Sequence, residues 1–175
     1  MWAFFLTVNT DNNAKRDANG PALLKTLRNI ERLLKFGPCP SGWMHFKSGY
    51  CYFVSSAIKT WHKAQAYCKR LGGELVNINS NEENEFVLKL VHEHEPSLKQ
   101  VWIGLKWVTS QFIWSDDSVP NYTKWASGEP NGKASEPCSN MWIKHLTAPG
   151  INGYWNDLSC WHPTYPCGIV CKRLP

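Results

Sequence analysis

The sequence predicts an α+β fold for a compact, disulfide-stabilised domain, and three observations support this prediction. Thr60 and Ser80 each precede an amphipathic segment and belong to the residue types that cap helices well. Residues 101–105 are an apolar run with the length and composition of a buried strand. Seven cysteines in 175 residues have a spacing typical of disulfides formed in an oxidising compartment. This length allows one domain with a substantial core and an extension.

Residues 1–20 are predicted to lie outside that domain. Residues 1–8 form a short apolar run without the basic residues that begin a complete signal peptide, and residues 9–20 are polar and rich in turn formers. We therefore expect a remnant of a signal peptide or a disordered segment here. No stretch approaches the roughly 20 apolar residues of a membrane helix, so the chain as given is expected to be soluble.

Residues 21–38 predict an amphipathic helix, or neck, which ends at a Gly-Pro pair. Apolar side chains recur along it at spacings of four, three and four residues, at Leu23, Leu27, Ile30 and Leu34. Such a stripe either pairs with a second copy of the chain or packs on the chain's own domain. The pattern leaves both alternatives open.

Residues 39–175 are predicted to form the compact domain, which opens with a hairpin clipped by Cys39–Cys51. A first helix follows Thr60, buries one apolar face and ends at a Gly-Gly pair. A strand is expected over residues 75–78. A second helix follows Ser80, which is placed to form a capping box with Glu83.

Residues 106–139 predict a long irregular stretch. A loop of this length in a compact domain is usually either functional or disordered. Three aromatic residues within it, Trp114, Tyr122 and Trp125, favour a loop that is pinned to the core. Functional residues are therefore expected in this loop or beside it.

One part of this loop and a later segment together carry five oxygen-bearing side chains: Glu129, Asn131, Glu136, Asn156 and Asp157. Calcium takes 6–8 oxygen ligands at about 2.3–2.6 Å, often from loops. The five side chains and one backbone carbonyl would supply about six ligands and leave about two positions open. The alternative interpretation is an acidic surface loop that binds nothing.

The order of these motifs resembles the sugar-binding calcium site of C-type lectins. The motifs are Glu-Pro-Asn from Glu129, Glu-x-Cys from Glu136, Trp-Asn-Asp-x-x-Cys from Trp155, and the strand motif Trp-Ile-Gly-Leu from Trp102. The resemblance covers residues 39–171. It implies two helices flanking small antiparallel sheets, a cis peptide bond before Pro130, and the disulfides Cys68–Cys171 and Cys138–Cys160.

The resemblance also implies that the five candidate ligands bind a sugar as well as calcium. The sugar's hydroxyls would complete the calcium shell, with Glu129 and Glu136 accepting hydrogen bonds from them and the amides of Asn131 and Asn156 donating. Asp157 would mainly hold the ion. In that family Glu-Pro-Asn goes with mannose, fucose or N-acetylglucosamine.

Two departures from the family pattern predict one calcium ion. The acids that hold a second ion in many relatives are missing after residue 105, where Lys106 begins a stretch without an acid until Asp116. A further acid expected after Glu136 is replaced by Pro137. Asp116 and Asp117 are predicted to be turn residues before Ser118.

Two residues carry further predictions. Cys167 is left over from the three disulfides, so it is either a free thiol or an interchain bridge that would link copies of the chain. Asn121 begins the sequon Asn-Tyr-Thr and is a candidate glycosylation site if the protein is secreted.

The sequence argues against nucleic-acid binding and against enzyme activity. A net charge of +5 is small and diffuse, which argues against binding to nucleic acid. Paired carboxylates could serve a glycosidase, but calcium ligation explains Glu129 and Glu136 better, and we predict no enzyme activity. We expect a secreted, extracellular lectin for microbial or cell-surface sugars. The alternative is a structural matrix or biomineral-associated protein that uses the acidic loop without reading sugars.

Overall fold

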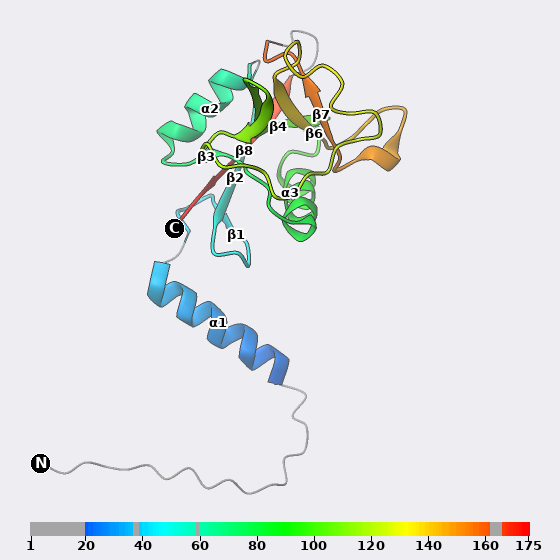
Figure 1. The fold of residues 1–175 in the computed structure, drawn as a ribbon. Helices are drawn as coiled ribbons and strands as arrows, with labels where there is room; N and C mark the ends of the chain where they lie inside the picture. Colours follow the sequence, from blue (N-terminus) through cyan, green and yellow to red (C-terminus); the bar gives the residue numbers. More distant parts are fainter. Residues whose placement is uncertain (1–19, 37–38, 59, 162–165) are drawn as a thin grey trace, which may run out of the picture. The chain divides into compact units, whose positions relative to one another are not determined.

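The computed structural model describes residues 20–36, 39–58, 60–161 and 166–175, without the side chains of residues 32–36 and 57–58. The chain divides into two units, residues 1–37 and residues 38–175, which we describe separately (Figure 1). The predicted segment of residues 1–20 lies almost wholly outside the described residues.

The first unit contains one described helix, α1 (Gly20–Phe36). Its apolar side chains Leu23, Leu27 and Ile30 are exposed, and so is Leu24. The side chain of Leu34 lies outside the described residues. Whether this stripe pairs with a second copy or packs on the chain's own domain therefore stays a prediction. None of the described helices combines the length and apolar composition needed to cross a membrane.

The second unit is built on one eight-stranded sheet. Its main path runs β1 (Met44–His45), β2 (Cys51–Ile58), β8 (Cys167–Arg173), β4 (Gln100–Val108), β6 (Cys138–Trp142) and β7 (Trp155–Leu158). The strand β3 (Glu74–Leu75) pairs with β8, and β5 (Gln111–Trp114) pairs with β4. The named strands pair antiparallel except β4 and β8, which run parallel. The strands thus form one mixed sheet, where the resemblance implied several small antiparallel ones.

Two α-helices and a short 3-10 helix complete this unit: α2 (Trp61–Arg70), α3 (Asn81–His94) and η1 (Pro149–Ile151). The side chain of Thr60 accepts a hydrogen bond from the Lys63 amide at 3.2 Å, and that of Ser80 accepts one from the Glu83 amide at 3.1 Å. The Glu83 carboxylate, however, accepts from the amide of Asn79, one residue before the cap. The capping box is therefore half formed, because Glu83 turns inward to Lys172.

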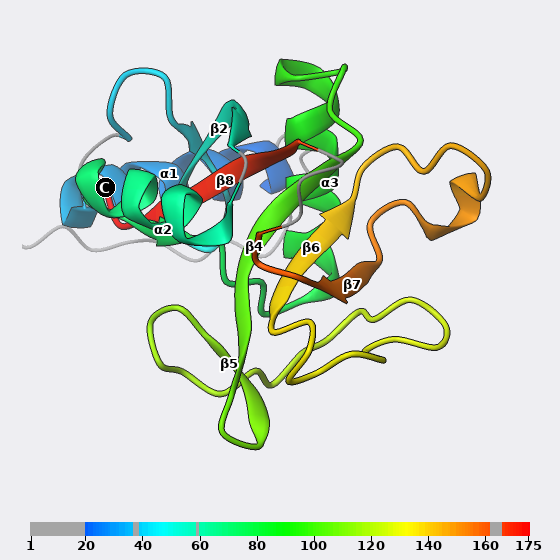
Figure 2. The same ribbon diagram turned by 90° about the horizontal axis from the view of Figure 1, so that it is seen from above.

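The sheet separates two hydrophobic cores, because successive side chains of a strand point to opposite faces. Val101, Ile103 and Leu105 of β4 pack with residues of α3 on one face. Trp102 packs with Trp61 and other residues of α2 on the other face. Figure 2 shows the two helices on opposite sides of β8 and β4. The α+β class and the two flanking helices are confirmed.

Three disulfides fasten this arrangement, and they are the pairs that the sequence analysis named: Cys39–Cys51, Cys68–Cys171 and Cys138–Cys160. The second ties α2 to β8 across 103 residues, which is worth on the order of 4–5 kcal/mol in the chain-entropy model. The third ties β6 to the segment after β7.

Cys167 is a free cysteine in β8 and is buried, with 1% of its surface exposed. Burial raises the pKa of its thiol well above the ordinary range, which makes the thiolate scarce. An interchain disulfide at Cys167 would require β8 to leave the sheet. The structure therefore supports the free-thiol alternative over the interchain bridge.

Candidate functional site

The buried indole of Trp155 pins the long loop to the sheet. Its ring centroid lies 5.6 Å from that of Trp114, 5.7 Å from that of Tyr122 and 6.0 Å from that of Trp125. Its Nε1 atom donates a hydrogen bond to Oδ1 of Asn84 in α3 at 2.8 Å. The aromatic residues of the loop therefore converge on the strand that carries the Asn-Asp pair.

The backbone of the loop also runs alongside β7. The Trp155 amide donates to the Lys124 carbonyl at 2.7 Å, and the Ala126 amide donates to the Trp155 carbonyl at 2.8 Å. The Glu129 amide then donates to the Ala126 carbonyl at 3.0 Å, which closes a turn. This pairing brings Glu129 to the strand end where Asp157 stands. Figure 2 shows the loop passing beside β6 and β7.

Asp157 anchors the turn that follows the Glu-Pro-Asn motif. The Glu129–Pro130 peptide bond is cis, as the resemblance implied. The Asp157 carboxylate, 1% exposed, accepts hydrogen bonds from the amides of Asn131 at 3.0 Å, Gly132 at 3.0 Å and Lys133 at 2.7 Å. Hydrogen bonds to a charged acceptor are about twice as strong as neutral ones. The carboxylate thus organises the loop before any ligand arrives.

Glu136 folds back over the same turn. A Cβ atom on Gly132 would lie 2.4 Å from Cγ of Glu136 and 2.5 Å from its Oε2 atom, so only glycine leaves room for this side chain. The Glu136 amide donates to the Lys133 carbonyl at 3.1 Å and closes the turn. The sequence therefore sets Glu136 against the Glu-Pro-Asn segment.

The carboxylates of the site repel one another. The pKa of Glu129 is raised from 4.5 to about 6, first because the group is partly buried and then because it contacts Asp157, with Glu136 adding a smaller effect. Its Oε2 atom is buried and, within the described residues, has no hydrogen-bond partner. An acceptor left in this state beside other carboxylates favours a bound cation.

The described residues nonetheless contain no group of three or more His, Cys, Asp or Glu side chains gathered closely enough to form a metal centre on their own. Both oxygens of Asp157 already accept hydrogen bonds from backbone N–H groups. Asn131 and Asn156 carry carboxamide side chains and no charge. The donor set, all oxygen and spread over two loops, fits calcium better than metals that prefer nitrogen or sulfur. The residues present fit the ion, with amide oxygens as necessary ligands.

The side chains of Asn131 and Asn156 differ in whether their Nδ2 atoms are still free to donate hydrogen bonds. The Asn131 side chain is exposed. The Nδ2 atom of Asn156 already donates to Oδ1 of Asn140 at 3.3 Å and to the carbonyl of Asp157 at 2.7 Å. An amide nitrogen carries two hydrogens, so donation from Asn156 to a sugar would break one of these bonds. That role stays a prediction.

Asn140 is the residue that sequence reasoning missed. It is fully buried in β6 and lies directly opposite Asn156 in the antiparallel pairing of β6 with β7. The signal in the sequence was an amide in the middle of a short strand, between Ser139 and Met141. That signal could not identify a partner before the register was known.

Asp116 and Asp117 lie in a turn. The Asp116 carboxylate accepts from the Ser118 amide at 3.1 Å and from the Asn77 side chain at 2.6 Å, and Asp117 has a positive φ of 65°. Lys106 lies over the Trp61 ring at 5.7 Å from its centroid. The prediction of turn residues agrees with this geometry. Asn121 is exposed, and its glycosylation stays a prediction.

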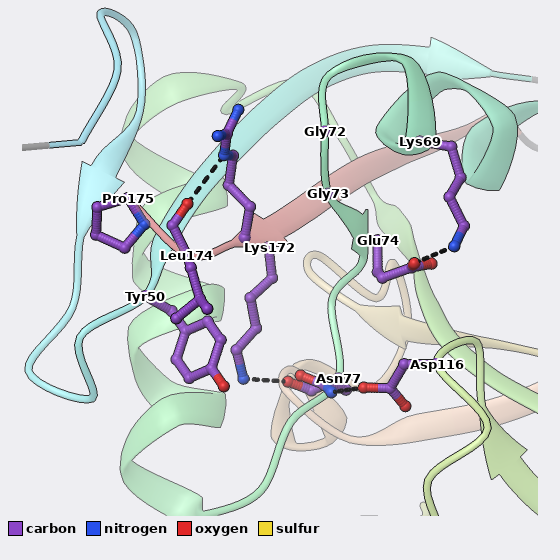
Figure 3. A pocket seen from close by; sticks show the side chains of 11 residues that line it. Tyr50, Lys69, Gly72, Gly73, Glu74, Asn77, Asp116, Lys172, Leu174 and Pro175 are labelled. Carbon is purple, nitrogen blue, oxygen red and sulfur yellow. Dashed lines mark hydrogen bonds and ion pairs between the residues drawn. The ribbon is translucent and has the colours of Figure 1, made fainter. Parts of the chain in front are cut away.

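A cavity of about 510 Å³ is formed by residues other than the five candidate ligands (Figure 3). Most of its polar side chains take part in ion pairs or hydrogen bonds. Lys69 pairs with Glu74, Asn77 donates to Asp116, and Lys172 donates to the Asn77 carbonyl at 3.0 Å. The Oδ1 atom of Asn77 is buried without a hydrogen-bond partner among the described residues, but one such atom does not define a ligand, and we assign the cavity none.

Comparison with known proteins identifies the family. The family model described as the Lectin C-type domain matches residues 57–173. A perlucin-like protein of Mytilus galloprovincialis is 32% identical over 136 residues, which cover 76% of this chain and 81% of that protein. A mannose-binding C-type lectin isoform of Notechis scutatus scutatus is 35% identical, over 70% of this chain and 77% of that protein.

Solved structures agree on the fold. The cow C-type carbohydrate-recognition domain of CD23, crystallised in the presence of a GlcNAc2Man3 oligosaccharide, is 33% identical with a TM-score of 0.65 and covers 79% of this chain and 97% of that one. A calcium-independent type II antifreeze protein also has a TM-score of 0.65, at 27% identity, and covers 78% of this chain and 95% of that one. The fold therefore occurs in at least one protein that does not depend on calcium.

The chain belongs to the C-type lectin domain family. Domains of this family are carbohydrate-binding modules without enzymatic activity, which confirms the prediction that the chain is not an enzyme.

Proposed function

We propose that this chain is an extracellular lectin that reads mannose-type glycans through a single calcium ion. The observation that supports it most is the contact of Glu129 with Asp157, which together with burial and a smaller effect of Glu136 raises the pKa of Glu129 to about 6. Calcium would supply a positive centre that accepts sugar hydroxyls as ligands. The residues Glu129, Asn131, Glu136, Asn156 and Asp157 would hold it.

Each side chain has a distinct part in this proposal. Asp157 keeps the Glu-Pro-Asn turn in place through three backbone amides. Glu129 and Glu136 accept hydrogen bonds from the hydroxyls of the sugar. Asn131, whose side chain is exposed, donates to one of them. A shallow site of this kind binds one sugar weakly, so useful affinity depends on several sites acting together.

The preference for mannose is argued from the positions of the hydrogen-bond donors and acceptors around the calcium ion. Glu129 accepts and Asn131 donates, which suits the paired hydroxyls of mannose, fucose or N-acetylglucosamine. The mannose-binding relative and the cow domain crystallised with a mannose-containing oligosaccharide support this choice. Microbial or cell-surface sugars are the expected partners.

A glycan array with and without a calcium chelator tests the proposal, and calorimetry counts the ions. We expect binding to mannose-containing glycans, its loss on chelation, and one ion per chain. Sugar binding that survives the chelator would contradict calcium mediation. Two ions of comparable affinity, one of them lost on mutating Asp116 or Asp117, would contradict the single site.

Exchanging the two residues that flank Pro130 is expected to change the preferred sugar. In the double variant Glu129→Gln and Asn131→Asp, the acceptor and the donor trade places while the oxygen ligands remain. The preference for mannose over galactose should narrow or reverse, because each mismatched polar group costs about 1–3 kcal/mol. Competition by free mannose and free galactose measures it. Elution of the unmodified protein by galactose but not mannose would refute the preference.

The second candidate function is a structural matrix or biomineral-associated protein, and one observation favours it. The antifreeze protein shows that this fold also occurs in a protein named for a role other than binding sugars. Under this alternative the acidic loop binds no sugar, so free mannose would not compete for the protein's natural surface.

Assembly through α1 is a separate expectation. If Leu23, Leu27, Ile30 and Leu34 join a second copy, deleting residues 1–36 should give a monomer with unchanged affinity for one sugar and much weaker agglutination, because avidity is lost. Sedimentation of the full and shortened chains measures the assembly. A full chain that sediments as a monomer would place the stripe against its own domain.

A further inference from the structure

A row of four polar side chains, three of them buried, crosses the sheet from the candidate calcium site to Cys167. We call Asn156, Asn140, Gln100 and Cys167 the polar row. Its members come from β7, β6, β4 and β8, which are consecutive neighbours in the sheet. Asn140 is 0% exposed, Gln100 1% and Cys167 1%, so these three side chains are shielded from water, whereas Asn156 is only partly buried.

The members contact one another in order. Nδ2 of Asn156 donates to Oδ1 of Asn140 at 3.3 Å, and Nδ2 of Asn140 donates to Oε1 of Gln100 at 3.0 Å. The Gln100 side chain lies close enough to the Cys167 thiol to lower the pKa of that thiol against the larger effect of burial. The Nε2 atom of Gln100 is itself buried and has no hydrogen-bond partner among the described residues. The amides of Asn156 and Asn140 therefore each direct their nitrogen to the next member of the row.

The strand register places all four side chains on one face. Asn140 lies opposite Asn156 in the pairing of β6 with β7 and opposite Trp102 in its pairing with β4. Gln100 is two residues before Trp102 and so shares its face. The parallel pairing of Val101 with Gly168 sets Cys167 beside Gln100. The row thus follows from the topology of the sheet.

The row fixes the orientation of the Asn156 side-chain amide. The bonds to Asn140 and to the Asp157 carbonyl occupy both hydrogens of its Nδ2 atom and fix the rotation of the amide. Its Oδ1 atom is then the atom that remains to coordinate an ion. A buried polar group without partners is costly, so the row also favours this one orientation over its flipped form.

We infer that Asn140 and Gln100 are positioning residues for the calcium site, which hold the Asn156 amide with its oxygen presented as a ligand. This inference rests on the proposed function and adds two residues outside the ligand set. Partners that orient metal ligands from behind typically contribute about 10–100-fold to metal affinity.

The test compares Asn140→Ala with Ser139→Ala in the full chain. Ser139 is the adjacent residue, equally buried, and its hydroxyl has no hydrogen-bond partner among the described residues. Asn140→Ala is expected to weaken calcium binding by about ten-fold in calorimetry, while Ser139→Ala leaves it within about two-fold. Gln100→Met interrupts the row one step further away and should give an intermediate loss.

A second readout needs no calcium. In chelator, the side-chain amide protons of Asn156 in the unmodified protein should exchange slowly with solvent in nuclear magnetic resonance spectra. They should exchange several-fold faster in Asn140→Ala but not in Ser139→Ala. If the unmodified protein binds no calcium, the proposed function fails, and this readout still decides whether Asn140 orients Asn156.

Two results would overturn the inference. One is a folded Asn140→Ala whose calcium affinity equals that of Ser139→Ala. The other is unchanged exchange of the Asn156 amide. Should Asn140→Ala not fold, Gln100→Met carries the same two measurements, and an unchanged affinity together with unchanged exchange would overturn it equally.

Discussion

Replacing Asp157 with alanine should abolish calcium binding and also destabilise the calcium-free domain. The three backbone amides that it holds would lose a charged acceptor, and hydrogen bonds to charged groups contribute about 1.5–3 kcal/mol each. Water replaces part of this loss, so we expect the free energy of unfolding to fall by about 3 kcal/mol. Thermal unfolding in chelator, followed by calcium calorimetry, measures both effects.

Two further variants separate charge loss from loss of the anchor. Glu93→Ala removes an exposed carboxylate of α3 that pairs with Lys89, and it should change neither property. Asp157→Asn keeps an acceptor oxygen but removes the charge, so it should retain much of the stability and lose most of the calcium affinity. An Asp157→Ala protein that binds calcium as tightly as the unmodified chain would remove Asp157 from the site.

The stability of the calcium-free protein should depend on pH through Glu129. Burial and the neighbouring Asp157 raise the pKa of Glu129 from 4.5 to about 6 in the folded state. An acid whose pKa rises on folding destabilises the fold when it is charged. The penalty is therefore full above pH 6 and disappears as the pH falls below about 4.5. In chelator, Glu129→Gln should be more stable than the unmodified protein near neutral pH, and the difference should vanish in acid.

With calcium bound, the order of stability should reverse, so that the unmodified protein is more stable than Glu129→Gln near neutral pH. The ion binds the deprotonated carboxylate, so the unmodified protein should hold calcium with constant affinity above about pH 6 and lose up to about ten-fold per pH unit below it. Glu129→Gln should bind calcium more weakly at neutral pH and lack that part of the pH dependence. Melting curves with calcium and with chelator over this range give both trends. Full sugar binding at a pH that protonates free carboxylates would refute calcium mediation.

The sequence by itself determined the class of fold and the members of the candidate site. The helix starts at Thr60 and Ser80 are visible because a capping side chain acts on amides only three residues away. Strand β4 is visible because its five apolar residues leave no polar face. The Glu-Pro-Asn and Trp-Asn-Asp motifs identified the family because their order and spacing are specific, and they pointed to the disulfides as well.

The tertiary structure alone decided how the site is held. Asp157 looks like one more calcium ligand in the sequence, yet the fold makes it the acceptor of three amides that lie 24 to 26 residues before it. The burial of Cys167 depends on β8 lying between β2 and β4, which no local pattern reveals. Asn140 and Gln100 stand 40 residues apart and meet only because β4 and β6 are neighbours. Local chemistry places caps and turns, whereas the partner of a buried amide is set by strand order and register.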